Sequence, residues 1–127
     1  MKEFMLLILN RGDSKKTFSP EKHTEFVRKC EVYIERLRKE GHLISAQPLL
    51  REGMILSGSG GKWKEIPVND NNEIQVGYYH IAARDLDEAV AIAKGNPEFE
   101  YTSAARIEVR PIKMKEESTG FVYPKNM

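Results

Sequence analysis

Residues 4–41 read FMLLILNRGDSKKTFSPEKHTEFVRKCEVYIERLRKEG and contain the two best-defined elements of the chain. The first six of these residues are all apolar, which predicts a β-strand that is covered on both faces. Ser19 suits a helix N-cap, Pro20 fits the first helical position, and Gly41 suits the left-handed residue that ends a helix. Between them, apolar residues recur at three- and four-residue steps, as on one buried helix face. This stretch therefore predicts a strand followed by a long amphipathic helix.

The rest of the chain continues this order. Residues 43–50 favour a second strand, and the SGSGG stretch at 57–61 is typical of the tip of a β-hairpin. Residues 74–82 alternate as a strand, Asp85 caps a short helix that Gly95 and Pro97 end, and residues 105–111 favour a last strand. The order predicts an α+β fold of the ferredoxin-like split βαβ type with a β-hairpin insertion. Two helices would then cover one face of an antiparallel sheet.

The first strand, residues 4–9, indicates how the other face of the sheet is covered. It is apolar on both faces, but the two helices can lie on only one of them. A second copy packed sheet to sheet would cover the remaining face through a two-fold interface. We therefore expect a sheet-to-sheet homodimer with a cleft at the interface.

Length, charge and cysteine content exclude several classes of protein. The chain has 127 residues, which suits one domain, and 20 Lys and Arg against 19 Asp and Glu. This balance argues against direct nucleic-acid binding, and Cys30 alone cannot form an internal disulfide framework. No apolar run reaches the length of a signal-peptide core or a membrane span. We expect a cytoplasmic protein that has no membrane partner and begins at Met1.

The order and spacing of several short motifs resemble those of the YCII-related (DGPF-domain) family, small bacterial proteins with a dimeric α+β barrel. The similar motifs are GHLIS at 41–45, GYY at 77–79, LDEAV at 86–90, AKGNP at 93–97 and EVRPI at 108–112. The resemblance implies a YCII-related domain over residues 1–112, followed by a C-terminal tail over residues 113–127.

The chain also departs from this family's pattern at its functional positions. The Asp-Gly-Pro-Phe signature falls on EIPV at 65–68, of which only Pro67 is kept, while the acidic residue before GYY is kept as Glu73. The resemblance places the helix histidine of the enzyme-like members at Cys30 and their dyad aspartate at Asn96. An asparagine holds no carboxylate charge, and a cysteine on an apolar helix face is a poor general base. The resemblance therefore implies that the His/Asp dyad is missing.

Two histidines remain as weak catalytic candidates. His23 would accept a proton only if a carboxylate oriented it; otherwise its ring packs near Phe18 or borders a pocket. His80 faces either the open side of the sheet, where it would bind an anion or transfer a proton, or the helices as a core residue. We expect Cys30 to pack in the core rather than act as a nucleophile. The three histidines lack metal-ligand spacing, so we expect no metal site and no cofactor.

Five residues near the ends of two strands form a candidate ligand-binding group: Tyr78, Tyr79, Arg106, Glu108 and Arg110. Alternation places the three charged side chains on one face of the last strand, opposite Ile107 and Val109. If the charged face is the open face of the sheet, it would line the dimer cleft and bind a small anion. The alternative is a network of salt bridges at the interface.

These features favour a homodimeric protein that binds a small molecule, including an anion, without catalysis. One alternative is a small hydrolase- or lyase-type enzyme that uses His23 or His80. A further alternative is a transcription-associated accessory protein that acts by protein contact. A histidine and a carboxylate within hydrogen-bond reach in one concave pocket would favour the enzyme.

Overall fold

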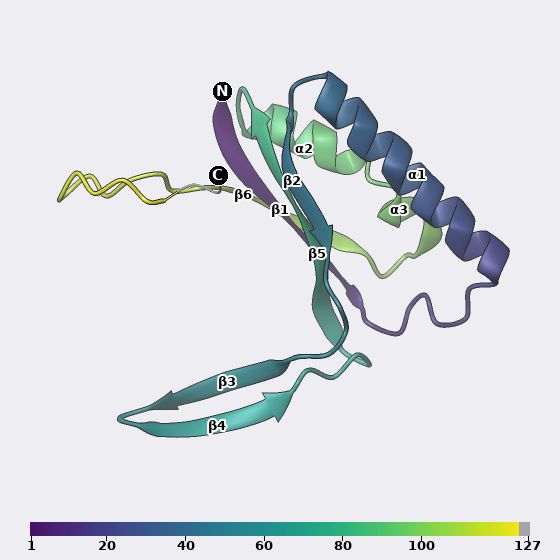
Figure 1. The fold of residues 1–127 in the computed structure, drawn as a ribbon, viewed down its shortest axis with the longest axis horizontal. Helices are drawn as coiled ribbons and strands as arrows, with labels where there is room; N and C mark the ends of the chain where they lie inside the picture. The colour runs from purple at the N-terminus through teal and green to yellow at the C-terminus, as the bar shows by residue number, and fades with distance from the viewer. Residues whose placement is uncertain (125–127) are drawn as a thin grey trace.

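A four-stranded antiparallel sheet, in the order β2-β5-β1-β6, carries the helices on one face (Figure 1). The structure is a computed structural model and describes residues 1–124. Its elements are β1 (Lys2–Arg11), α1 (Pro20–Lys39), β2 (Leu43–Pro48), β3 (Met54–Ser59), β4 (Lys62–Pro67), β5 (Glu73–Ala83), α2 (Leu86–Lys94), α3 (Glu98–Tyr101) and β6 (Arg106–Pro111). The order and pairing confirm the α+β, ferredoxin-like fold predicted from the sequence, with a hairpin between β2 and β5.

The central strand β1 separates the two faces of the sheet. Phe4, Leu6 and Ile8 are buried in the core beneath the helices, at 2%, 0% and 5% exposure. The alternate residues Met5 and Leu7 are only half-buried, because they point to the face that no helix covers. Among residues 1–124, helices therefore cover only one of the two apolar faces of this strand.

Helix α1 begins and ends where its sequence predicts. The Ser19 hydroxyl oxygen accepts the Lys22 N–H at 3.1 Å, and Gly41 adopts a φ of 78° just beyond the helix. The Tyr33 hydroxyl donates to the Ile92 carbonyl oxygen at 2.6 Å, which joins α1 to α2. The helix is thus fixed to its neighbour as well as to the sheet.

The end of α2 confirms the sequence prediction, because the helix stops at Lys94 with Gly95 as its C-cap. Pro97 then stands at the N-cap of a further short helix, α3, which the sequence did not indicate. A proline lacks the backbone N–H that the first helical turn leaves unpaired, so it can begin a helix as well as end one. The Asn96 side-chain oxygen accepts the Glu98 N–H at 2.8 Å, which fixes the start of this turn.

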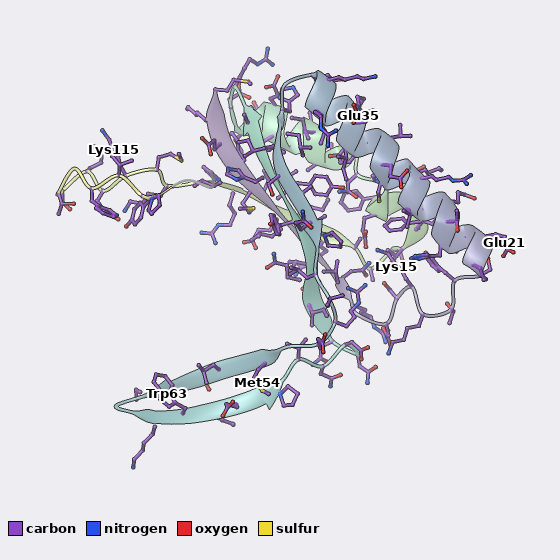
Figure 2. The ribbon with its side chains drawn as sticks, viewed as in Figure 1. Lys15, Glu21, Glu35, Met54, Trp63 and Lys115 are labelled. Atoms are coloured by element: carbon purple, nitrogen blue, oxygen red, sulfur yellow. The ribbon has the colours of Figure 1, made fainter. Side chains whose placement is uncertain are left out.

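The hairpin β3–β4 projects from the body of the molecule as an arm (Figures 1 and 2). Gly60 and Gly61 form its tip with φ values of 61° and 80°, which confirms the glycine-rich turn. Every residue of both strands is exposed, including Met54 and Trp63.

The C-terminal segment after β6 also extends away from the sheet (Figure 1). Lys115 and Val122 form an antiparallel bridge, and the Tyr123 N–H donates to the Met114 carbonyl oxygen at 2.9 Å. Within residues 113–124 the expected tail therefore turns back on itself. Residues 125–127 of that tail lie outside the described residues.

Candidate functional site

A cavity of about 540 Å³ lies between α1 and the sheet, at the end where β2 meets β5. Its volume falls within the range of roughly 300–1,000 Å³ that is usual for small-molecule pockets. Most of the lining is apolar, with side chains from α1, from the sheet and from the segment after β2: Ile8, Phe26, Val27, Ile34, Ala46, Pro48, Leu49, Leu50 and Val76.

Small residues in the sheet leave room for this cavity. Gly77 of β5 lies against the end of β2, where an added Cβ atom would stand 3.0 Å from the Gln47 carbonyl oxygen and 3.3 Å from the Pro48 Cα. Ala46 lies next to it on β2, and both residues line the cavity. A larger side chain at either position would fill part of the cavity or push β2 and β5 apart.

A buried ionic cluster lies at the inner end of the cavity, and it involves residues that the sequence did not single out. The Glu98 carboxylate accepts the Asn10 side-chain amide at 2.8 Å and lies 2.6 Å from the Lys15 Nζ. Asn10 and Glu98 are 1% and 4% exposed. The Lys15 ammonium also lies 4.0 Å from the centre of the Phe26 ring. Figure 2 shows Lys15 by the loop between β1 and α1, on the helix side of the sheet.

Asn96 lines the cavity beside this cluster and keeps an unused donor. Because its Oδ1 accepts the Glu98 N–H, the orientation of the amide is fixed and its Nδ2 points elsewhere. Within the described part of the chain, Nδ2 is buried with no acceptor at hydrogen-bond distance. A buried donor left unpaired costs about 1–3 kcal/mol. Such an unpaired donor is rare in native structures, which makes its surroundings of interest.

Tyr79 is the neighbour of the Asn96 amide and also lines the cavity. Burial raises the pKa of the Tyr79 hydroxyl well above its ordinary value, although the Asn96 amide acts in the opposite direction. The hydroxyl therefore keeps its proton and is a neutral donor. Its ring packs edge-on against Tyr33, with ring centres 5.5 Å apart.

Cys30 is half-buried, so it is less enclosed than the core position that the sequence predicted. Its side chain lines the same cavity. Burial and, to a lesser extent, the Glu98 carboxylate raise the pKa of its thiol to about 11, and the Lys15 ammonium opposes both. At neutral pH the group is an uncharged thiol, which is a poor nucleophile and a poor base.

The two candidate histidines lie on different faces of the sheet. His23 is exposed and lines the cavity, and no carboxylate within residues 1–124 accepts a hydrogen bond from its ring. His80 points to the open face, where its Nε2 lies 2.8 Å from a Glu3 carboxylate oxygen. The open-face alternative for His80 is thus the one that the structure shows. This His–carboxylate pair does not line the cavity.

The predicted ligand-binding group is divided between the faces. Tyr79 is buried beneath α1, whereas Tyr78 is half-buried on the open face. Along β6, Arg106, Glu108 and Arg110 are exposed, and the alternate residues pack toward the core. Arg106 donates to both carboxylate oxygens of Glu73, at 2.7 and 2.6 Å, and lowers the pKa of that carboxyl group. Of the five residues, only Tyr79 reaches the cavity.

Comparison with known proteins bears on the same residues. The family model of the YCII-related domain matches residues 3–113. This chain belongs to the YCII-related family. Among curated proteins, no match to it is found. The two positions at which the resemblance placed the dyad of enzyme-like YCII-related proteins, Cys30 and Asn96, both line the cavity.

Two properties of residues 1–124 concern membranes and metal ions. No helix there is both long enough and apolar enough to span a membrane. No three His, Cys, Asp or Glu side chains in that range lie close enough together to hold a metal ion.

Proposed function

We propose that this protein binds a small, mostly apolar molecule in the cavity between α1 and the sheet, without catalysing a reaction on it. The observation that carries the proposal is the cavity of about 540 Å³, whose surface is mostly apolar and includes Tyr79, a neutral hydroxyl donor. Pockets of this size, with a few polar groups that orient a ligand, are the usual form of small-molecule sites.

The chemistry of the lining favours binding over catalysis. General acid–base catalysis needs a group that exchanges a proton near neutral pH and is oriented by a partner. The Cys30 thiol stays protonated because its pKa is raised to about 11. The oriented histidine, His80, meets Glu3 on the opposite face of the sheet. These positions support a binding protein rather than a hydrolase or lyase.

The experiment uses N-phenyl-1-naphthylamine, a neutral apolar probe that fluoresces when it enters an apolar site. Val27 of α1 lines the cavity, and Val32 of the same helix is 70% exposed and lies outside it. We expect the wild type to bind the probe, Val27→Trp to bind it at least tenfold more weakly, and the matched Val32→Trp to be unchanged. Ala46→Leu, which fills the cavity from the sheet side, should act like Val27→Trp. Equal binding by all four proteins would contradict the proposal.

We also propose that the protein is a homodimer whose subunits pack through the open face of the sheet. Met5 and Leu7 on that face are half-buried apolar residues with no helix over them. A two-fold interface there would place Tyr78 and Arg110 in or beside a cleft between the subunits. Size-exclusion chromatography with light scattering should give a dimer for the wild type and a monomer for Leu7→Glu. A wild-type monomer at micromolar concentration would contradict this assembly.

A further inference from the structure

The charges that line the cavity are balanced, and both cations have oxygen partners. Two cations, Lys15 and Arg51, stand against two carboxylates, Glu31 and Glu98. Lys15 pairs with Glu98 at 2.6 Å, and the Arg51 guanidinium donates to two backbone carbonyl oxygens at 2.9 and 3.3 Å. An anionic ligand would meet the Glu98 carboxylate without an uncommitted cation to pair with. Burying a charge under those conditions is strongly unfavourable.

The groups left for a ligand at the inner end are neutral donors. The Asn96 amide has its oxygen committed to the Glu98 N–H, and its nitrogen lies beside the Tyr79 hydroxyl. Because the Asn96 nitrogen is a donor only, it cannot accept the Tyr79 proton, which is left for an acceptor in the cavity. The protonated Cys30 thiol adds no charge on this side. The hydrogen-bonding groups on this side of the cavity are therefore uncharged.

We infer that the ligand is an apolar molecule with one uncharged carbonyl oxygen, such as an aromatic ketone or ester, which accepts a hydrogen bond from the Tyr79 hydroxyl, with the buried Asn96 amide behind that hydroxyl as a positioning group. This inference rests on the proposed function, because it assigns a ligand class to the same cavity. It also separates the cavity from the anion site that the sequence suggested on the open face, where Arg106 is already paired with Glu73.

The test compares three probes of nearly the same shape: 2-acetylnaphthalene, 2-ethylnaphthalene and 2-naphthoate. Each is titrated against the bound N-phenyl-1-naphthylamine, and its affinity is obtained from the loss of fluorescence. A single neutral hydrogen bond of about 1 kcal/mol makes the ketone roughly fivefold tighter than the ethyl compound. We expect the carboxylate to bind at least tenfold more weakly than the ketone.

Two variants test whether the named donors cause this preference. Tyr79→Phe removes the hydroxyl and keeps the ring. Asn96→Asp keeps the oxygen that accepts the Glu98 N–H but replaces the donor with a second acceptor, which would take the Tyr79 proton. In both variants the ketone should lose its advantage over 2-ethylnaphthalene, whose own affinity stays the same. Tyr78→Phe, the neighbouring change on the opposite face, should leave the ratio at its wild-type value.

The outcomes separate this inference from the proposed function. Equal binding of the ketone and the ethyl compound to the wild type would overturn the inference, and so would tightest binding of 2-naphthoate. A preference that survives in both Tyr79→Phe and Asn96→Asp would also overturn it. In each case, if Val27→Trp abolished binding of the probes, the cavity would still be the binding site and only the ligand class would be wrong. If Val27→Trp had no effect, the proposed function itself would fail.

Discussion

Replacing Glu98 by Ala should destabilise the protein far more than its place in a four-residue helix suggests. The carboxylate is 4% exposed and is shared by the Asn10 amide and the Lys15 ammonium. Removing it leaves the side chain of Lys15, which is 16% exposed, with its charge unpaired. The Asn10 side chain, 1% exposed, loses its acceptor at the same time.

The size of the effect follows from these two losses. Breaking a buried ion pair from one side costs about 3–5 kcal/mol, and an unsatisfied buried amide costs about 1–3 kcal/mol. The two penalties overlap, because the Lys15 side chain can move toward solvent once it is released. We therefore expect about 3 kcal/mol of lost unfolding free energy, or a melting temperature lower by roughly 10 °C for a domain of this size.

Urea unfolding followed by circular dichroism measures the change, with Glu100→Ala as the matched control. Glu100 lies on the same helix and also pairs with a lysine, Lys29 at 3.2 Å, but both side chains of that pair are about half exposed. Exposed pairs contribute little, so Glu100→Ala should change the midpoint only slightly. Lys15→Met should cost less in the Glu98→Ala background than in the wild type, because it removes the unpaired cation. An equal, small effect of Glu98→Ala and Glu100→Ala would refute the reasoning.

Three further predictions concern residues around the cavity. Gly77→Ala places a Cβ 3.0 Å from the Gln47 carbonyl oxygen, so thermal unfolding should show a loss of about 1–2 kcal/mol; an unchanged melting temperature would mean that β2 yields freely. Alkylation of Cys30 by iodoacetamide at pH 8 should be roughly 100-fold slower in the folded than in the unfolded protein, because the folded pKa of about 11 lies above the reference value of 9.0. For the same reason, ionisation of Cys30 lowers stability as the pH rises from 9 toward 11; fast alkylation at pH 8 would contradict the buried position. Tyr33→Phe removes the hydrogen bond to the Ile92 carbonyl and should cost about 1 kcal/mol in urea unfolding, whereas no change would show that water replaces that bond.

The fold was largely predictable because its signals are local. Ser19 and Gly41 bound α1, Gly60 and Gly61 form the hairpin tip, and the spacing of apolar residues gives the order of strands and helices. The short helix α3 was missed because a proline after a glycine is consistent with both the end of one helix and the start of another.

The candidate site was harder to predict because it joins residues that are far apart in the sequence. Asn10 and Glu98 are separated by 88 positions, and neither is unusual in its local context. One signal was present: Asn10 follows Phe4, Leu6 and Ile8 at every second residue, so a polar side chain occupies the buried face of β1. The cavity itself is lined by residues from β1, α1, β2, β5 and the segment after α2, and such a combination leaves no comparable trace in the sequence.

The predicted ligand-binding group on β5 and β6 shows how far the pattern of a single strand reaches. Alternation along β6 correctly separated Arg106 and Arg110 from the core-facing residues. It did not show that Glu73, on another strand, pairs with Arg106. It also did not show which of the neighbouring residues Tyr78 and Tyr79 faces the helices. Pairing across strands depends on register, which single-strand patterns do not specify.

The most direct measurement is an NMR titration of the ¹⁵N-labelled wild-type protein with 2-acetylnaphthalene, which locates the ligand without any substitution. We expect the largest shifts in the Asn96 side-chain amide and in the backbone amides of cavity residues such as Val27 and Ala46. Shifts concentrated on the open face, around Leu7, Tyr78 and Arg110, with the Asn96 amide unchanged, would contradict a binding site beneath α1.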